Sequence, residues 1–316
     1  MTMEYRHLGK TGLIVSRYCF GSLTLGPLGA DLMPEQGSSL LLKAFRAGII
    51  FVDTAEYYRN YAHIRLALEQ FDDADNIVIA SKTLVPDDRS AAFAIEEARL
   101  GLNREVLDLF LLHEIRNWSD FQNRSGAWQV LLNAKANGIV KSIGISTHSA
   151  AVAARAALEP DVDVIHCMLN FAGVGILDGG VEDMLSAIAD AKANGKGVYT
   201  MKAIGGGSLM KQARKALLWA FSQELPDAVA VGCKDEAELL TNLGWLRGED
   251  PPQAEKCSKL PRRLVFDDCQ KCGACVARCA NGALTIDEDG IRWHNDKCLY
   301  CGYCVAACPG FCISFA

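Results

Sequence analysis

Short apolar runs alternate with longer amphipathic stretches along the first three-quarters or so of the chain. The runs are rich in β-branched and other apolar residues, whereas the stretches between them, such as AAFAIEEARLGL, repeat apolar positions at helical spacing. The runs predict strands at 17–20, 49–52, 77–80, 107–112, 142–145, 162–165, 197–200 and 228–231. Eight strand–helix units in this length predict a parallel (β/α)8 barrel, the TIM-barrel architecture.

The pattern changes at both ends of this region. The opening YRHLGKTGLIVSR predicts a hairpin that closes the bottom of the barrel. After residue 246 the segment RGEDPPQAEKCSKLPRR is rich in charge and proline, which is typical of a domain boundary. Further on, ALTIDEDGIRWH has two apolar segments around Asp289 and Gly290, a hairpin signal. We therefore expect a barrel at 1–246, a linker at 247–263 and a small α+β domain at 264–316.

Composition narrows the possible partners and location. Half of the 316 residues are hydrophobic, and 38 acidic side chains against 32 basic ones give a net charge of −6. Without a basic run, the chain is not expected to bind nucleic acid or an anionic membrane surface. The N-terminus lacks an apolar leader, and no uninterrupted apolar stretch is long enough to span a bilayer. The expected location is the cytoplasm.

Eight of the thirteen cysteines form two copies of the pattern C-x2-C-x2-C-x3-C. The copies are Cys269, Cys272, Cys275, Cys279 and Cys298, Cys301, Cys304, Cys308. Without a secretion signal, so many cysteines indicate metal ligation in a reducing compartment rather than disulfides. A zinc ribbon or a disulfide knot is the alternative, but zinc sites rarely take eight thiolates at this spacing.

The stretch from residue 264 onward resembles a bacterial dicluster ferredoxin, which implies two [4Fe-4S] clusters. In that family the fourth cysteine of each run ligates the other cluster. The implied ligand sets are Cys269, Cys272, Cys275 and Cys308 for cluster one, and Cys298, Cys301, Cys304 and Cys279 for cluster two. The proline expected after each run is present as Pro309 but replaced by Ala280 in the first run.

Polar side chains follow consecutive predicted strands of the barrel. Asp53 ends the second strand, Lys82 lies just past the third, and His113 ends the fourth, with Tyr58 in the loop after Asp53. Catalytic groups of such barrels lie at the carboxyl ends of strands. Taken singly, Asp53 could be a helix cap, Lys82 a surface lysine and His113 a core histidine. Four such residues at consecutive strand ends together favour a catalytic site.

The surroundings of these residues, DTAEYY, IASKT and LLHE, resemble the aldo–keto reductase family, and VSRYCFGSLTLG, IGIST and GGGSL add to the match. The resemblance implies a catalytic tetrad of Asp53, Tyr58, Lys82 and His113, with Tyr58 rather than Tyr57 selected by its spacing from Asp53. The implied reaction is hydride transfer to or from a carbonyl, with Tyr58 as acid or base. Lys82 is expected to lower the pKa of Tyr58, Asp53 to orient Lys82, and His113 to align the carbonyl oxygen.

The family binds NAD(P)H across the barrel mouth, and there the sequence departs from its pattern. Met201 replaces the tyrosine that stacks on nicotinamide, Thr147 replaces an asparagine, and His166 replaces a glutamine. Glu238 replaces the arginine that usually meets the 2′-phosphate, which favours NAD(H) over NADP(H), although Lys234 weakens that preference. The positions implied to contact a cofactor are Ser22, Ser146, Thr147, His166, Met201, Lys202, Gly207, Ser208, Gly232, Lys234, Glu238 and Asn242.

The glycine-rich loop GGGS, residues 205–208, follows the seventh predicted strand, and Gly232 follows the eighth. Loops at these two places form the usual phosphate site of such barrels. A pyrophosphate or the single phosphate of FMN would suit it.

The clusters expected in the C-terminal domain and the nicotinamide cofactor expected at the barrel differ in the number of electrons they transfer at a time. A cubane cluster carries one electron, whereas a nicotinamide delivers two as hydride. A bound flavin could split the pair, the clusters could feed a substrate carbonyl directly, or the tail could be structural beside an ordinary NAD(P)H carbonyl reductase. In another class of function, the chain is an electron-transfer or docking subunit whose barrel site is idle. The expected partners are a small carbonyl or alcohol and, as a redox partner, an external ferredoxin.

Overall fold

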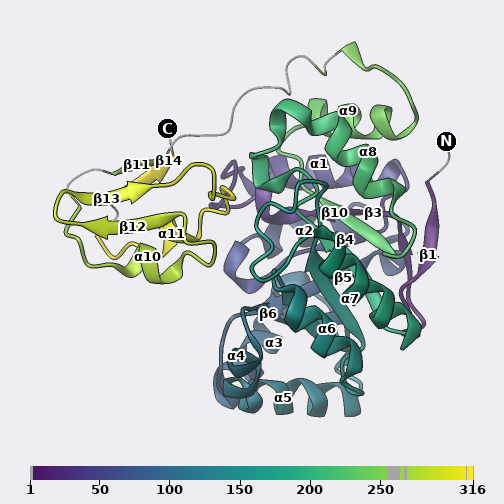
Figure 1. Ribbon diagram of the computed structural model, residues 1–316. Helices are drawn as coiled ribbons and strands as arrows, with labels where there is room; N and C mark the ends of the chain where they lie inside the picture. Colours follow the sequence, from purple (N-terminus) through teal and green to yellow (C-terminus); the bar gives the residue numbers. More distant parts are fainter. Residues whose placement is uncertain (1–2, 253, 255–263, 267–268, 311, 316) are drawn as a thin grey trace.

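The computed structural model describes residues 3–252, 254, 264–266, 269–310 and 312–315 of the chain (Figure 1). Among the described helices none is long and apolar enough to cross a membrane.

Eight parallel strands close into a barrel in the order β10-β3-β4-β5-β6-β7-β8-β9. They are β3 (Tyr18–Gly21), β4 (Phe51–Asp53), β5 (Val78–Thr83), β6 (Leu107–Ile115), β7 (Val140–Thr147), β8 (Val164–Met168), β9 (Gly197–Met201) and β10 (Ala228–Val231). All eight predicted strands are confirmed. Their ends differ, because β5 and β6 run further than the apolar runs. Lys82 and His113 therefore lie inside their strands, not past or at the end as predicted.

Helices surround the barrel and bury the outer face of its strands, while side chains in the barrel interior bury the inner face, so the strands read as continuous apolar runs. The α-helices are α1 (Pro34–Arg46), α2 (Tyr61–Leu68), α3 (Asp88–Leu102), α4 (Trp118–Asn123), α5 (Ser125–Ala136), α6 (Ala150–Leu158), α7 (Val181–Ala193), α8 (Ala213–Ser222) and α9 (Glu236–Leu246). Short 3-10 helices are η1 (Ser22–Thr24), η2 (Glu56–Tyr58), η3 (Ala74–Asn76), η4 (Gly205–Gly207) and η5 (Met210–Gln212). In α3 the Asp87 side chain caps the N-terminus by accepting from Ser90 N, and Asn103 ends the helix in the left-handed region.

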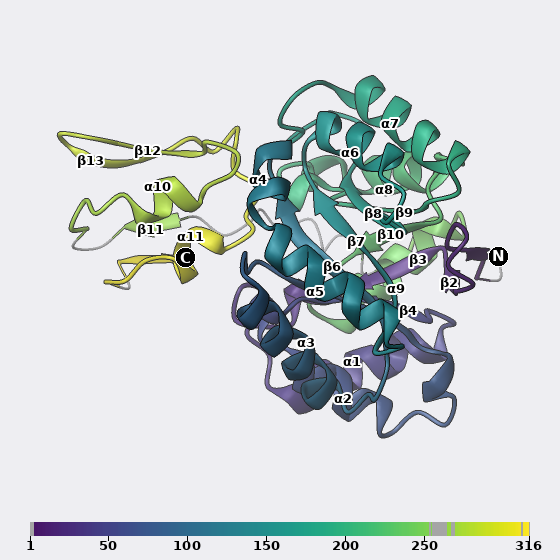
Figure 2. The ribbon, with the colours of Figure 1, turned by 90° about the horizontal axis from the view of Figure 1, so that it is seen from below.

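The N-terminal hairpin pairs β1 (Tyr5–His7) with β2 (Ile14–Ser16), antiparallel. Leu8 and Val15 are fully buried and join Phe51 and Tyr199 in the interior of the barrel. The hairpin therefore plugs one end of the barrel, as predicted, and lies on the far side from the C-terminal unit in both views (Figures 1 and 2).

The C-terminal unit repeats a small helix–strand pattern. Its elements are β11 (Leu264–Phe266), α10 (Ala274–Arg278), β12 (Leu284–Asp287), β13 (Gly290–Trp293), α11 (Tyr303–Ala306) and β14 (Ile313–Phe315). β12 and β13 form the predicted hairpin, and β11 pairs with β14. Leu264, Leu284 and Ile313 form its core with the cysteines. Most of the predicted linker, residues 253 and 255–263, lies outside the described residues, and the domain bounds stay predictions.

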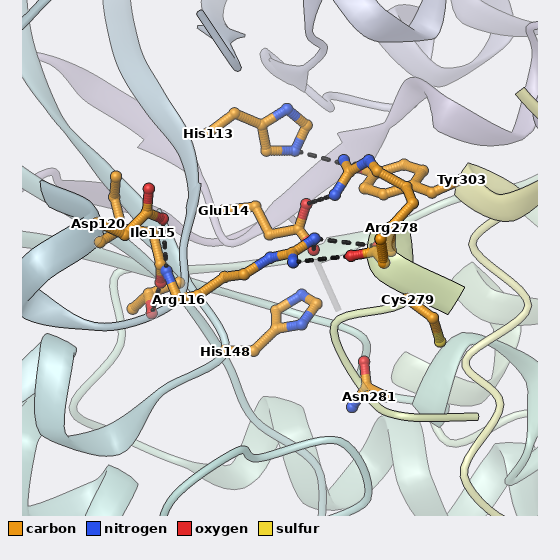
Figure 3. A network of polar contacts seen from close by, with 12 residues as sticks. His113, Glu114, Ile115, Arg116, Asp120, His148, Arg278, Cys279, Asn281 and Tyr303 are labelled. Carbon is orange, nitrogen blue, oxygen red and sulfur yellow. Dashed lines mark hydrogen bonds and ion pairs between the residues drawn. The ribbon is translucent and has the colours of Figure 1, made fainter. Parts of the chain in front are cut away.

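The C-terminal unit contacts the barrel beside α4 (Figure 2). Arg278 Nη1 bonds Glu114 Oε2 at 2.7 Å, and Arg116 Nη2 donates to the Arg278 carbonyl at 3.0 Å (Figure 3). Asn281 Nδ2 donates to the Gly175 carbonyl at 3.2 Å. Because Glu114 lies at the carboxyl end of β6, these contacts place the unit over the mouth of the barrel.

Candidate active site at the barrel mouth

A buried ion pair lies at the carboxyl ends of β4 and β5. Lys82 Nζ donates to both carboxylate oxygens of Asp53 at 2.8 Å and also to the Thr54 carbonyl. Tyr199 Oη donates to Asp53 Oδ2 at 2.8 Å. Burial raises the pKa of Asp53 and lowers that of Lys82, while the pairing opposes burial for both. These contacts fix the position of the Lys82 ammonium group beside Tyr58.

Tyr58 is buried in η2, with its ring centre 5.1 Å from Lys82 Nζ. Burial raises the pKa of Tyr58 well above its usual value, and the Asp53 carboxylate acts in the same direction. This net direction is opposite to the predicted lowering by Lys82, because the phenol is shielded from water and Asp53 pairs with the lysine. Tyr58 is a protonated phenol, and its role as acid or base stays a prediction.

His113 contacts two hydroxyl groups. Its Nε2 lies 3.4 Å from Tyr58 Oη and 3.1 Å from Tyr303 Oη, which belongs to the C-terminal unit. Burial, followed by the charge of Lys82, lowers the pKa of His113 well below its usual value, so the ring is neutral. The Tyr303 hydroxyl thus occupies Nε2 of the histidine that is predicted to align the substrate carbonyl.

Tyr303 is held by aromatic and cationic neighbours. Its ring packs edge-on against Tyr57 at 5.0 Å, and the Arg278 guanidinium lies 4.5 Å from the ring centre (Figure 3). Arg278 also pairs with Glu114 of the barrel. The same arginine therefore holds the C-terminal unit on the barrel and keeps the Tyr303 ring beside His113.

A cavity of about 230 Å³ lies beside Tyr58. Its barrel wall includes Asp53, Tyr58, His166, Met201, Lys202 and Gly232, and the C-terminal unit contributes Leu299, Tyr300 and Cys301. The His166 ring stacks on Tyr199 at 3.8 Å, and its Nε2 has no hydrogen-bond partner among the described residues. An unpartnered polar atom in a mostly apolar cavity is a place for a ligand amide or hydroxyl.

A groove of about 200 Å³ continues from this cavity along shared residues that include Gly206, Gly232 and Tyr300. Gly207, Lys234 and Glu238 line its far part, where Lys234 Nζ pairs with Glu238 at 2.9 Å. Ser208 lines a neighbouring cavity. The two hollows together form an extended path across the mouth, the shape that a dinucleotide needs.

Four of the predicted cofactor contacts do not line these hollows. Ser146 Oγ accepts from Glu114 N, and Thr147 Oγ1 donates to the Ile115 carbonyl. The remaining two are engaged as well, Ser22 Oγ by Asn60 Nδ2 and Asn242 Nδ2 by Tyr18 Oη and Cys233 Sγ. In this structure these side chains support the backbone and core, and their contact with a cofactor stays a prediction.

The eight motif cysteines line two separate cavities. One is lined by Cys269, Cys272, Cys275 and Cys308, and the other by Cys279, Cys298, Cys301 and Cys304. These are the crossed sets that the ferredoxin resemblance implies. In the described part of the chain no three His, Cys, Asp or Glu side chains are grouped closely enough to share a single ion.

Backbone amides point at sulfur in both sets. Lys271 N and Cys312 N donate to sulfurs of the first set at 3.4 and 3.2 Å, and Tyr300 N and Ala283 N to the second at 3.4 and 3.3 Å. Such bonds stabilise thiolates and tune iron–sulfur clusters. The donor sets and their amides fit two clusters.

Cys301 is common to both kinds of site. It lines the thiol cavity of the second set and also the cavity beside Tyr58, as do Lys202, Leu299 and Tyr300. A group bound by the second set would therefore share a wall with the catalytic cavity.

The sequence analysis missed Tyr303, Arg278 and Leu299 as parts of the site. A signal was present in the duplication, because the two cysteine runs differ at these positions: Gln270 matches Leu299, Ala274 matches Tyr303, and Arg278 matches Ala307. The copies diverge where one of them meets the barrel.

Comparisons with known proteins agree with the geometry. The aldo/keto reductase family model matches residues 17–217, and a 4Fe-4S dicluster domain model matches residues 263–309. L-galactose dehydrogenase from Arabidopsis thaliana is 26% identical over 254 residues, covering 76% of this chain and 78% of that protein. D-threo-aldose 1-dehydrogenase from Pseudomonas sp is 28% identical over 188 residues, but only 49% of this chain and 56% of that protein align.

Among solved structures, aldo-keto reductase AKR11C1 from Bacillus halodurans (holo form) shares the fold with a TM-score of 0.65 at 17% identity, over 81% of this chain and 97% of that one. The chain belongs to the aldo/keto reductase family, is an oxidoreductase, and carries a 4Fe-4S dicluster domain over the mouth of its barrel.

Proposed function

We propose that this protein interconverts a small carbonyl compound and its alcohol, with electrons passing through two [4Fe-4S] clusters. The observation that carries the proposal is the position of Cys301, which lines both the thiol cavity and the catalytic cavity. A structural tail would have no need of a ligand thiol in the wall of the active site.

The clusters would be held by the two crossed cysteine sets. When bound, each supplies or accepts one electron. Reduction of a carbonyl to its alcohol takes two electrons and two protons, because the C=O double bond becomes a single bond while one C–H and one O–H bond form. Two clusters hold the required pair of electrons, Tyr58 would supply the proton on oxygen, and solvent would supply the proton on carbon. The reductant would be a one-electron donor of the ferredoxin class.

The residues of the barrel handle the proton and the orientation. Asp53 holds Lys82 in place beside Tyr58, and Tyr58 donates its phenol proton to the carbonyl oxygen. In the reverse direction the same oxygen of Tyr58 takes the proton from the alcohol. His113, whose Nε2 lies 3.4 Å from the Tyr58 hydroxyl, would align the carbonyl oxygen beside Tyr58.

Members of this family use NAD(P)H, and the hollows at the mouth fit such a cofactor. His166, Met201, Lys202 and Gly232 would contact its reactive end, and Gly207, Lys234 and Glu238 its far end. The carboxylate of Glu238 supports NAD(H) over NADP(H), since it would repel a 2′-phosphate. FMN is the alternative occupant, because a flavin exchanges one or two electrons.

The test is anaerobic. With the clusters assembled, NADH and NADPH are added separately while cluster absorbance and EPR are followed, and bound flavin is assayed. We expect chemically reduced protein to convert carbonyl to alcohol, with two electrons used for each product. Tyr58→Phe should lose most of this rate while its clusters remain reducible by dithionite.

Two other readings make different predictions. An electron carrier with an idle barrel site would transfer electrons equally well as Tyr58→Phe. An ordinary NAD(P)H reductase with a structural tail would turn over equally fast with its clusters oxidised and uninvolved. Either result would replace the proposal.

A further inference from the structure

Lys202 joins the two cavities that the proposed function connects. It follows β9 directly and lines both the catalytic cavity and the cavity of the second thiol set. Its backbone adopts a left-handed conformation with φ of 60°, which is costly for a lysine and directs the chain out of the strand. The tetrad chemistry does not use this ammonium group.

Burial lowers the pKa of Lys202, and its neighbour in the cavity wall carries no compensating charge. Its Nζ donates to His148 Nε2 at 2.9 Å, and burial and Lys202 itself keep the pKa of His148 well below its usual value. The imidazole is therefore neutral. The carboxylate in the same wall, Glu114, is paired with Arg278 at 2.7 Å.

The ammonium group belongs to the same cavity wall as the thiols of the second set. Lys202 lines that cavity together with Cys279, Cys298, Cys301 and Cys304.

The first thiol set has a different environment. Apart from the thiols, its cavity is lined by Gln270, Gly273, Ile291, Pro309, Gly310 and Ile313, so no charged side chain is among the described lining residues. Cys272 of this set is exposed, whereas Cys298 of the second set is buried. Only the second set faces the barrel.

We propose that the charge of Lys202 raises the reduction potential of the cluster held by Cys279, Cys298, Cys301 and Cys304, and so directs electrons toward the catalytic cavity. The inference rests on the proposed function. Reduction adds one negative charge to a cluster, and burial alone makes that addition harder. A cation beside the thiolates stabilises the reduced form. Each transfer oxidises the ferredoxin-class donor by one electron and reduces one cluster, with no bond made or broken.

The test is an EPR-monitored potential titration of the assembled full-length chain with Lys202→Met, which removes the charge. We expect the potential of the second cluster to fall while that of the first stays unchanged, which makes the first cluster an internal control. Cys301→Ser, which alters one ligand of the second set, identifies which signal belongs to that set. Lys202→Arg restores a cation and should restore the potential.

Lys211→Met is the matched control, because Lys211 lies on the same rim but lines neither thiol cavity. It should titrate like the parent chain. If Lys202→Met does not assemble its clusters, the potentials are measured on Lys202→Gln. Its side chain carries no charge but can still donate to His148. Intact clusters with unchanged potentials, or equal shifts in both, would overturn the inference alone. A parent chain that binds no clusters would overturn the proposed function as well.

Discussion

At the scale of single residues, burial decides the chemistry of the site. Asp53, Tyr58, Lys82 and His113 are each at most 6% exposed. In such surroundings a charge persists only where it has a partner, as between Lys82 and Asp53, and the phenol and the imidazole stay neutral. The tetrad is thus one ion pair beside two neutral groups that can exchange a proton.

Removing one partner of the ion pair should destabilise the fold. Asp53→Asn leaves the Lys82 ammonium buried without a counter-charge, and the expected loss is about 3–5 kcal/mol of unfolding free energy. Denaturant unfolding measures it. As a control, Arg155→Ala breaks the exposed pair with Glu159 and should cost less than about 1 kcal/mol. Equal small losses in both variants would contradict this account.

The hydroxyl of Tyr303 competes with a substrate oxygen for His113. In Tyr303→Phe the ring keeps its packing against Tyr57 and Arg278, but Nε2 becomes available. Since one hydrogen bond contributes about 0.5–1.5 kcal/mol, KM for the carbonyl should fall roughly two- to tenfold. Steady-state kinetics check it, with Tyr5→Phe as the control, because that hydroxyl bonds the Gly48 carbonyl beside the N-terminal hairpin, away from the site. An unchanged KM would refute the competition.

At the scale of elements, glycines in the loops after β8 and β9 let the C-terminal unit approach. A Cβ on Gly206 would lie 1.9 Å from the Leu299 carbonyl oxygen, and one on Gly175 would lie 2.8 Å from the Leu299 side chain. The loop at 205–208, predicted from sequence as a phosphate site, therefore also receives the dicluster domain. Gly207 and Ser208 still line the hollows beside it.

Gly206→Ala should loosen the docking of the two units. Gly138→Ala is the matched control, since Gly138 also has a positive φ, of 71° against 66°, but a Cβ there would meet nothing within 4 Å. Each change costs about 1 kcal/mol of backbone strain, but only Gly206→Ala should increase hydrogen exchange in 269–310. If both variants exchange alike, Gly206 is not a docking residue.

At the scale of the whole molecule, the dicluster domain covers part of the mouth of the barrel and forms one wall of its cavity. Three neutral histidines, His113, His148 and His166, are buried there between the barrel and the dicluster domain. Burial lowers the pKa of each well below its usual value. We therefore expect the stability of this interface to depend on pH.

Stability should fall on the acid side. Below pH about 6.5, the pKa of a histidine in the unfolded chain, the unfolded chain binds protons that the buried native histidines do not bind. The unfolding free energy therefore decreases as the pH falls below this value. Each histidine contributes up to about 1.4 kcal/mol per pH unit. Denaturant unfolding at pH 7.0 and 5.5 measures the sum, and His148→Gln should reduce the slope. A flat profile would contradict buried neutral histidines.

The sequence by itself determined the barrel, because buried strands read as apolar runs, and its resemblance to two families implied the tetrad and the crossed cysteine sets. Tertiary structure alone decided that Tyr303 reaches His113, that Cys301 and Lys202 line two cavities, and that Tyr58 is buried. These facts depend on burial and on contacts between residues far apart in the sequence, and neither has a signature in local spacing.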